Sequence, residues 1–513
     1  AVVFDEVHNG KFISAYSTGS YYFDVHPPLG RLLMKFFGDV VGAPSSVDFG
    51  TIGNEIPIEI VFLRLLPLLA GIFLPIVIYF ICLYLNMSKL SSFVVGLLIC
   101  LENSLLVQSR FILFDIIMLL FGFLSVLSYL IYIDLRKDRR NDEKNIDSYK
   151  KRTGIFWHFL ILVLSAIFSA GAFSIKWTGL AFPLLIIILE ILRIFSTKKS
   201  GEIEEKERLM NKVRSFLIKI RKIIGFLLFY MIVGIVFYSS IFAIHFAYLK
   251  NSGTGDSFMS NRFQKTLIGN QYVGDSSIQT KGFWGKMIEL NIEMYEANKT
   301  LTTEHNYSSS WYTWPIMLRP IFYWQSPQSK VDQSIVGVES KNSMKDSQKG
   351  DLAWRSYIYL LGNPLIYWLG TFSIIFLFIY SFRLFTMRFK KKIAVVENSD
   401  LLSILKNKEI ISFILIGFLV NFIPFIFIGR VMFLYHYESA LIFSIISIVF
   451  IIDLVFFVKG NTGEEIEKRS KNIIFLVIVA LCTVTFIYFS PLTYGFSVND
   501  KQLSSMIWFS SWR

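Results

Sequence analysis

The chain has 513 residues, of which 54% are hydrophobic and 17% aromatic, and its mean hydropathy is +0.53. These values exclude an ordinary soluble globular protein and are typical of a polytopic membrane protein. The net charge of +13 would suggest a nucleic-acid partner in a soluble protein. Here most of the excess lies in short loops between apolar segments, where it indicates membrane orientation instead, and we expect no nucleic-acid partner.

In chain order, residues 1–57 read as a mixed polar and aromatic loop, and ten apolar segments long enough, or nearly long enough, to span a bilayer follow. The second and fourth are short, which leaves them tilted, partly re-entrant or buried among other helices. Gly171 and its small neighbours separate the fourth from the fifth, which predicts a tight hairpin. The stretch 201–222 is open to a second interpretation, as an amphipathic helix at the interface. The ten segments are Ile60–Leu85, Leu90–Val107, Phe111–Ile133, Gly154–Ser169, Phe173–Ile194, Ile223–Tyr248, Tyr357–Phe382, Ile410–Ile428, Val431–Val458 and Ile473–Phe489.

Clusters of Lys and Arg follow the third, fifth, seventh and ninth segments, so that side is predicted to be cytoplasmic. The loops 1–57 and 249–355 and the tail are then extracytoplasmic. One further helix before Ala1 would explain a first loop on that side and would bring the total to eleven. The predicted division is a first loop (1–57), membrane helices (58–248), a large loop (249–355), C-terminal membrane helices (356–490) and a tail (491–513).

The first loop contains the densest group of carboxylates and histidines in the chain. They lie in Phe4-Asp5-Glu6-Val7-His8 and in Asp24-Val25-His26-Pro27-Pro28. Ionisable residues at membrane helix ends are costly, so each is a functional candidate. Convergent Arg and Lys side chains suit a lipid phosphate, and a neighbouring carboxylate supplies a base. This combination predicts a transferase that uses a lipid-linked phosphate donor. The ionisable residues predicted on the outer face are Asp5, Glu6, His8, Asp24, His26, Arg64, Arg110, Asp115, Lys176, His305, Arg430 and His436.

Several of these residues have structural alternatives. Asp5 and Glu6 suit the start of a helix, whose dipole favours acids, and Arg64 suits an interfacial position with its charge in the head groups. Arg110 can simply pair with Asp115. Lys176, next to Trp177, suits an interfacial anchor. Two N-glycosylation sequons begin at Asn298 and Asn306. The sequence contains no Gly-rich phosphate loop before a strand–helix unit, no zinc-type Cys/His spacing and no evident Ser–His–Asp set.

Motifs along nearly the whole chain resemble those of the protein O-mannosyltransferases, which move mannose from a dolichyl (polyprenyl) phosphate to Ser or Thr of proteins. The order of the motifs and their consistent side of the membrane carry the resemblance more than any one motif does. They are Phe4-Asp5-Glu6-Val7-His8, Asp24-Val25-His26-Pro27-Pro28-Leu29, Arg64-Leu65-Leu66-Pro67, Gln108-Ser109-Arg110-Phe111, Ser174-Ile175-Lys176-Trp177, Asn251-Ser252-Gly253-Thr254-Gly255-Asp256, Trp311-Tyr312-Thr313-Trp314-Pro315, Gly362-Asn363-Pro364, Tyr435-His436-Tyr437, Ser490-Pro491-Leu492-Thr493-Tyr494-Gly495 and Trp508-Phe509-Ser510-Ser511-Trp512.

The resemblance implies an all-α GT-C glycosyltransferase fold with eleven transmembrane helices, ten of them in this chain. It implies that Asp5 is the catalytic base of an inverting transfer and that Glu6 is its partner. His305-Asn306-Tyr307-Ser308-Ser309 resembles the family's His-Pro-Tyr-Ser-Ser, with Asn306 in place of proline. No residue is assigned to a metal, and a divalent metal stays open because carboxylates are present without a dedicated cage. The donor phosphate and lipid are assigned to Arg64, Arg110, Lys176, Arg430 and His436, and the donor sugar or the acceptor to His26, His305 and Tyr307.

The chain departs from the eukaryotic members in one respect, because its 249–355 loop has no room for their β-trefoil MIR domain. This is typical of a prokaryotic or a reduced eukaryotic member, and it leaves a homo- or heterodimer open. The expected location is the endoplasmic reticulum membrane in a eukaryote and the plasma membrane in a prokaryote, with membrane lipid, the donor and Ser/Thr-containing proteins as partners. The alternatives are a GT-C transferase that places a sugar on a lipid or glycan, a non-enzymatic transporter and a partner-binding pseudoenzyme.

Overall fold

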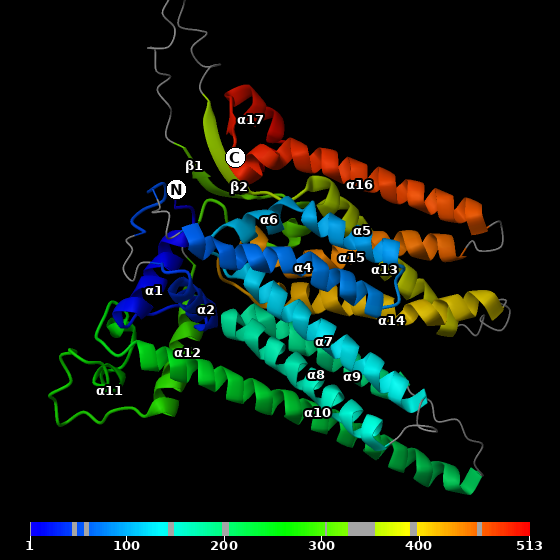
Figure 1. The fold of residues 1–513 in the computed structure, drawn as a ribbon, viewed down its shortest axis with the longest axis horizontal. Helices are drawn as coiled ribbons and strands as arrows, with labels where there is room; N and C mark the ends of the chain where they lie inside the picture. Colours follow the sequence, from blue (N-terminus) through cyan, green and yellow to red (C-terminus); the bar gives the residue numbers. More distant parts are fainter. Residues whose placement is uncertain are drawn as a thin grey trace, which may run out of the picture.

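A bundle of long helices lying side by side forms most of the molecule, and shorter elements gather at one end of it (Figure 1). The computed structural model describes residues 2–43, 49–55, 61–141, 148–196, 205–302, 305–326, 354–389, 398–458 and 464–513. The short elements at the end of the bundle, on the left of Figure 1, are called the cap below: α1, α2, α11, α12, α17 and a small sheet.

Within the described ranges, nine helical segments are long and apolar enough to cross a membrane, and a tenth span is a helix pair bent by 60°. This confirms the predicted helical polytopic class and nine of its ten segments, and the second predicted segment corresponds to the bent pair. The bent pair is α5 (Lys89–Cys100) and α6 (Asn103–Arg110), at the second predicted segment. The other spans contain α4 (Leu65–Tyr84), α7 (Asp115–Asn141), α8 (Ser148–Ile175), α9 (Ala181–Ser196), α10 (Glu205–Tyr248), α13 (Pro364–Phe389), α14 (Asn398–Phe422), α15 (Glu438–Val458) and α16 (Glu464–Tyr494).

The bend between α5 and α6 explains why the second predicted segment is short. Glu102 lies at the break and caps α6, because its carboxylate accepts a hydrogen bond from the backbone N–H of Ser104 at 3.0 Å. The same carboxylate accepts from the backbone N–H of Asn363, just before α13, at 3.1 Å. A broken helix inside a membrane protein needs partners for its released backbone groups, and here a buried acid supplies part of them.

The helices α7 and α15 form the centre of the bundle. About 67% of each apolar span is buried inside the protein, against 17% for the span of α16. Small residues allow the close approaches, since a Cβ built on Gly370 of α13 would lie 2.6 Å from the hydroxyl of Ser444 in α15. Such small-residue contacts are typical of helix packing in membranes. Lipid tails are as apolar as the helix surfaces, so helices associate through close packing and not through the hydrophobic effect.

The structure corrects two boundaries of the predicted segments and one alternative interpretation. Gly171 does not form the turn between the fourth and fifth segments but lies inside α8. This helix ends just before Lys176, and the 3₁₀ turn η2 (Trp177–Leu180) follows. The seventh segment begins at Pro364, because Tyr357 belongs to a strand. Residues 205–222 are the first part of α10 and form no separate interfacial helix. Residues 201–204 lie outside the described part of the chain. Apolar composition alone does not distinguish a strand or a tight turn from a helix end.

The first loop is not a simple loop, because it contains α1 (Glu6–Thr18) and α2 (Leu29–Val40). A parallel bridge pairs Ser20 with Asn251 and so joins this region to the segment after α10. The rest of the cap comprises α11 (Asn261–Gln264), α12 (Phe283–Thr300), α17 (Asp500–Met506) and the antiparallel strands β1 (Ile321–Gln325), β2 (Arg355–Leu360) and β3 (Ser497–Val498), with Ile321 opposite Leu360 and Arg355 opposite Val498.

We predict that Gly179→Ala destabilises the protein. A Cβ at Gly179 would lie 2.5 Å from the backbone carbonyl of Ala172, and backbone cannot rotate away as a side chain can. Overpacking of this kind costs roughly 1–3 kcal/mol, so the thermal midpoint in detergent should fall by several degrees. Gly225→Ala in α10 is the matched control, since nothing lies within 4 Å of its Cβ position and alanine favours helix. An unchanged midpoint for Gly179→Ala would contradict the close approach.

Candidate active site

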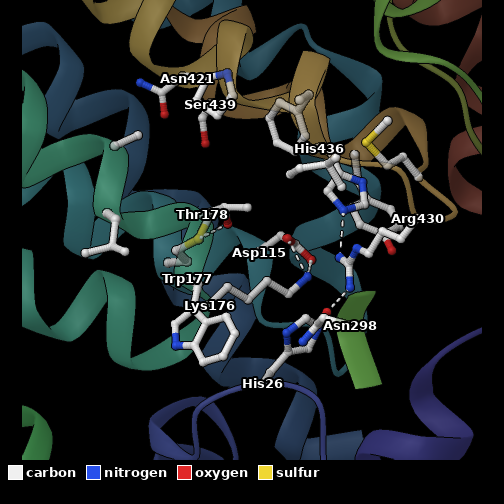
Figure 2. Close-up of a pocket in the computed structure, with 18 of the residues that line it drawn as sticks. His26, Asp115, Lys176, Trp177, Thr178, Asn298, Asn421, Arg430, His436 and Ser439 are labelled. Carbon is white, nitrogen blue, oxygen red and sulfur yellow. Dashed lines mark hydrogen bonds and ion pairs between the residues drawn. The ribbon is translucent and has the colours of Figure 1, made fainter. Parts of the chain in front are cut away.

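A cavity of about 570 Å³ lies where the long helices meet the cap (Figure 2). Side chains from α7, α9, α12, the α14–α15 connection and the loop before α2 line it. Four of the sequence-predicted site residues are brought together here, namely His26, Lys176, Arg430 and His436, and Asp115 joins them. The polar residues thus converge on the face of the bundle that carries the cap.

An ion pair between Lys176 and Asp115 forms one wall of the cavity. The Lys176 ammonium lies 2.7 Å from both carboxylate oxygens of Asp115, and both side chains are largely buried. The ammonium also lies 5.0 Å from the ring centre of Tyr435. Asp115 opens α7, where the helix dipole favours an acid. The Arg110–Asp115 pair considered from the sequence is therefore wrong, since Asp115 pairs with Lys176.

Arg430 and His436 form a second polar group, which lies beside the Lys176–Asp115 pair in the view of Figure 2. The Arg430 guanidinium donates to the side-chain oxygen of Asn298 in α12 and lies 3.3 Å from Nε2 of His436. The other ring nitrogen of His436, Nδ1, lies 3.0 Å from the backbone carbonyl oxygen of Phe433, and the ring stacks on Trp314. These contacts hold the Arg430 guanidinium in place in the lining of the cavity.

His26 follows Asp24 in the loop before α2 and lines the cavity below Lys176. Burial holds the pKa of His26 well below its usual range, and the nearby positive charges of Lys176, Arg31 and Arg430 lower it further. The imidazole is therefore neutral at physiological pH. A neutral ring both donates and accepts hydrogen bonds, which suits contact with a hydroxyl group better than contact with a phosphate.

Asp5 lies directly before α1, at its N-cap position, and its side chain makes no capping hydrogen bond. It is not part of the cavity lining, but it lies within electrostatic range of it. Burial raises the pKa of Asp5 above its usual value, Lys176 and His8 lower it, and Asp115 raises it. The helix-start position considered from the sequence is therefore correct, and it leaves the carboxylate beside the cavity without a helix-capping role.

Glu6 is completely buried and is held by four hydrogen bonds. The Arg64 guanidinium donates through Nε at 2.8 Å and through Nη2 at 2.6 Å, and the backbone N–H groups of Val3 and Ile112 donate at 3.0 and 2.9 Å. Neither Glu6 nor Arg64 lines the cavity. The pair connects the first loop to the start of α4 and to the turn between α6 and α7, immediately next to Asp5.

The other predicted cation, Arg110, lies away from the cavity. Its guanidinium donates to the backbone carbonyls of Thr493 and Tyr494 at the end of α16 and lies 4.8 Å from the ring centre of Tyr494. A cation near the C-terminal carbonyls of a helix is stabilised by the helix dipole. The structure therefore gives Arg110 a helix-capping position and does not bring it together with Lys176 or Arg430.

His305 and Tyr307 also lie outside the cavity lining. The His305 ring packs edge-on against Phe4, with ring centres 6.4 Å apart, and against Phe433, at 5.1 Å. Tyr307 packs against Phe322 of β1. His305 thus contacts Phe4, the residue before Asp5, and does not face the cavity.

Arg31 of α2 is a buried cation that was not among the residues predicted from the sequence. It is only 3% exposed, its Nε lies 2.7 Å from a carboxylate oxygen of Asp24, and its guanidinium lies 4.4 Å from the ring centre of Phe114. Burial raises the pKa of Asp24, and Arg31 opposes that rise. The apolar residues of α2, Leu29, Leu32 and Met34, were the signal that residues 29–40 form a packed helix. Within the described ranges, no three His, Cys, Asp or Glu side chains are close enough to hold a metal ion.

The arrangement of the helices is that of a GT-C glycosyltransferase, as comparison with a solved structure shows. The chain superposes on the structure of the Saccharomyces cerevisiae protein O-mannosyltransferase Pmt1-Pmt2 complex bound to the sugar donor, with a TM-score of 0.78 and 18% identity. The match covers 100% of this chain and 89% of that chain. This confirms the predicted GT-C fold class.

Two family models together match most of the sequence. Residues 1–250 match the model described as dolichyl-phosphate-mannose-protein mannosyltransferase, and residues 283–512 match the C-terminal four TMM region of protein-O-mannosyltransferase. The chain belongs to the protein O-mannosyltransferase family, as the resemblance predicted.

Individual relatives match shorter stretches. Protein O-mannosyltransferase 1 of Drosophila melanogaster is 28% identical over 270 residues, which is 52% of this chain and 27% of the relative. Dolichyl-phosphate-mannose--protein mannosyltransferase 4 of Candida albicans is 29% identical over 276 residues, which is 52% of this chain and 33% of the relative. The matches thus span about a third or less of the length of these two relatives.

We predict that Glu6→Gln destabilises the protein strongly. An amide nitrogen cannot accept the hydrogen bonds that Arg64, Val3 and Ile112 donate to Glu6, and Arg64 would lose its anion. Breaking a buried ion pair on one side costs about 3–5 kcal/mol, so the thermal midpoint in detergent should fall by several degrees or more. Glu296→Gln is the control, because its pair with Lys299 is exposed and contributes little. Equal midpoints for the two variants would contradict the anchoring role of Glu6.

Proposed function

We propose that this protein transfers mannose from dolichyl or polyprenyl phosphate mannose to Ser or Thr hydroxyls of proteins, on the extracytoplasmic face of the membrane. The observation that carries the proposal is the placement of Lys176 and Arg430 in one cavity at the cap end of the apolar helices, with Lys176 within electrostatic range of the carboxylate of Asp5. Family membership agrees with this assignment.

The charge of the cavity suits a lipid phosphodiester. Three cations line it, Lys176, Lys299 and Arg430, against two carboxylates, Asp115 and Glu438. Cations thus outnumber acids in the lining, which suits the negative charge of a sugar phosphodiester. Arg430 offers forked donors and Lys176 a point charge, the two modes by which proteins bind phosphate. His436 orients Arg430 through their 3.3 Å contact.

The cavity also has an apolar side that suits a polyprenyl tail. Leu180, Leu184 and Phe427 line it and are 51%, 45% and 83% exposed, and all three belong to segments apolar enough to span a membrane. An apolar chain leaving the phosphate along these residues passes from the cavity to the lipid without crossing water. The phosphate site and the tail route are thus next to each other at one surface.

Asp5 is the proposed base of a single inverting displacement. Its carboxylate takes the proton of the acceptor hydroxyl while the hydroxyl oxygen forms a bond to the anomeric carbon. The bond from that carbon to the phosphate oxygen breaks, and the electron pair leaves with the lipid phosphate. Lys176 and Arg430 stabilise the charge that develops there. A β-linked donor then gives an α-mannosyl product.

The remaining predicted residues take supporting roles in this proposal. Glu6 and Arg64 hold the Asp5 segment against the membrane helices through their ion pair. His26, neutral and in the cavity, contacts hydroxyls of the sugar or the acceptor. His305 and Tyr307 shape the acceptor side of the cap, and Arg110 caps α16.

The predicted division of the chain stays part of the proposal, with the catalytic loop at 1–57, membrane helices at 58–248 and 356–490, and extracytoplasmic segments at 249–355 and 491–513. We place a eukaryotic form in the endoplasmic reticulum membrane and a prokaryotic form in the plasma membrane. A homo- or heterodimer and a divalent metal remain open alternatives. The second candidate function is a GT-C transferase whose acceptor is a lipid or a glycan.

Asp5→Asn is expected to abolish most of the transfer. Purified full-length protein in nanodiscs receives radiolabelled polyprenyl-phosphate mannose and a Ser/Thr-rich peptide. Loss of a general base costs about 100-fold or more in rate, so labelling of the peptide should fall by at least that factor. Asp39→Asn is the matched control, since Asp39 is an exposed acid of the cap that pairs with Lys35, and it should label normally.

Three results of this assay would count against the proposal. Full activity of Asp5→Asn would refute the assignment of the base. Label on a lipid or glycan but not on the peptide would favour the second candidate function. No transfer to any acceptor by the wild-type protein would favour a non-enzymatic role.

Arg430→Met is expected to weaken donor binding. Removing one charged partner of a phosphate forfeits about 1.5–3 kcal/mol, so KM for the donor should rise at least tenfold while KM for the peptide stays within about twofold. Lys286→Met is the control, because this lysine lies over the ring of Phe246, outside the cavity. An unchanged donor KM in Arg430→Met, with an unchanged thermal midpoint, would remove Arg430 from the phosphate site.

A further inference from the structure

The residue before Asp5 has an unusual backbone conformation. Phe4 has a φ angle of +38°, one of three non-glycine residues with positive φ in the described ranges, the others being Asn86 and Met317. Left-handed backbone places Cβ against the following carbonyl and is disfavoured for bulky side chains. A residue stays in this region only where its surroundings hold it there.

Three aromatic rings surround the ring of Phe4. It stacks on Tyr323 of β1, with ring centres 4.5 Å apart and planes 7° apart. His305 and Phe433 pack edge-on against it, with ring centres 6.4 and 6.3 Å away. These three residues, called the aromatic cage below, come from separate parts of the chain: the strand β1, the segment after α12 and the α14–α15 connection.

We propose that Phe4 is a positioning residue for Asp5, and that the aromatic cage holds it in the left-handed conformation that aims the Asp5 carboxylate. The inference rests on the proposed function, in which Asp5 is the base. It goes beyond that function by assigning to Phe4, Tyr323, His305 and Phe433 an effect on catalysis without contact with the reacting atoms.

The positions of the two neighbours of Asp5 support this assignment. On one side, Glu6 is fixed by Arg64 and by the backbone of Ile112. On the other side, Phe4 is fixed by the cage. Asp5 itself makes no capping hydrogen bond, so its direction depends on the backbone on either side. If the ring of Phe4 lost its stacking partner, the backbone at residue 4 would relax to an ordinary φ and turn the carboxylate.

The cage packs against Phe4, directly before Asp5, and Tyr323 lies within electrostatic range of Asp5. Burial is the main cause that raises the pKa of Asp5, and the buried ring of Tyr323 feels the charge of Asp5 in turn. The other ionisable groups in range come from each element packed around it: His8 of α1, Arg31 of α2, Asp115 of α7 and Lys176 before η2, with Tyr435 and His305 on the cage side. Opening the cage admits water and lowers the pKa of Asp5 toward its usual value.

The experiment compares Tyr323→Leu with Tyr323→Phe in the full-length protein. The Tyr323 hydroxyl has no hydrogen-bond partner within the described residues, so phenylalanine keeps the stack and should retain kcat within about twofold. Leucine removes the stack, and a base displaced by about 1 Å loses roughly 100-fold. We expect kcat of Tyr323→Leu to fall tenfold to 100-fold, on the order expected for such a displacement, with both KM values near those of wild type.

A pH profile separates positioning from a general loss of structure. The base acts when deprotonated, so kcat rises as pH rises through the pKa of Asp5. Because that pKa is raised by burial in the intact cage, the acidic limb of Tyr323→Leu should lie at lower pH than that of wild type and of Tyr323→Phe. Phe4→Leu should reproduce both the loss of kcat and the displaced limb.

The control is Phe23→Leu, which removes another stacked ring of the cap. Phe23 stacks on Phe258 at 4.4 Å, and its loss should leave kcat and the acidic limb unchanged. Wild-type kcat in Tyr323→Leu, or equal losses in Phe23→Leu, would overturn the inference. If Asp5→Asn is inactive in the same assay, that failure concerns Phe4 alone. If Asp5→Asn is active, the proposed base is wrong, and the inference is overturned with it.

Discussion

The buried carboxylate of Glu6 is the interaction on which the arrangement of this molecule depends. A charge without water costs several kcal/mol unless it is paired and hydrogen-bonded. Glu6 meets that cost with four hydrogen bonds, one from the neighbouring backbone of Val3 and three from two distant parts of the chain, at Arg64 and Ile112. Those donors can converge only if the first loop docks on α4 and on the turn before α7. The docking in turn places Asp5 beside the membrane helices and closes the cap over the cavity.

The charged groups of the cavity occupy helix ends, where the protein offsets their desolvation most readily. Asp115 opens α7, and Glu438 opens α15, both at the positive end of a helix dipole. Lys176 follows the last residue of α8, at the negative end. A membrane protein that must gather charge at one surface can thus do so at the breaks between its spans. The same breaks provide the irregular backbone that lines a cavity.

Much of this fold could be predicted from the sequence, because each span needs about 20 apolar residues and the basic loops identify one side. Apolar content does not define ends, so Gly171 was taken for a turn that in fact lies at Lys176. The helix α1 was missed because it is short and rich in polar residues. The helix α2 has apolar residues at Leu29, Leu32 and Met34, but it was missed because it is too short to span a bilayer. Side-chain pairing depends on tertiary packing, so the sequence placed Lys176 and Asp115 on the same face but did not pair them.

The contacts of Asn298 distinguish the two glycosylation sequons of the chain. Its side-chain nitrogen donates to the backbone carbonyls of Val25, at 2.6 Å, and of Met294, at 2.8 Å, while its oxygen accepts from Arg430. A glycan on that nitrogen would replace a hydrogen that these bonds use, and the sugar would separate α12 from the first loop. The side chain of Asn306 is exposed, so a glycan there would displace no contact of the cavity. In a compartment that attaches N-linked glycans, modification at Asn298 and assembly of the cavity therefore exclude each other, whereas a glycan at Asn306 is compatible with the fold.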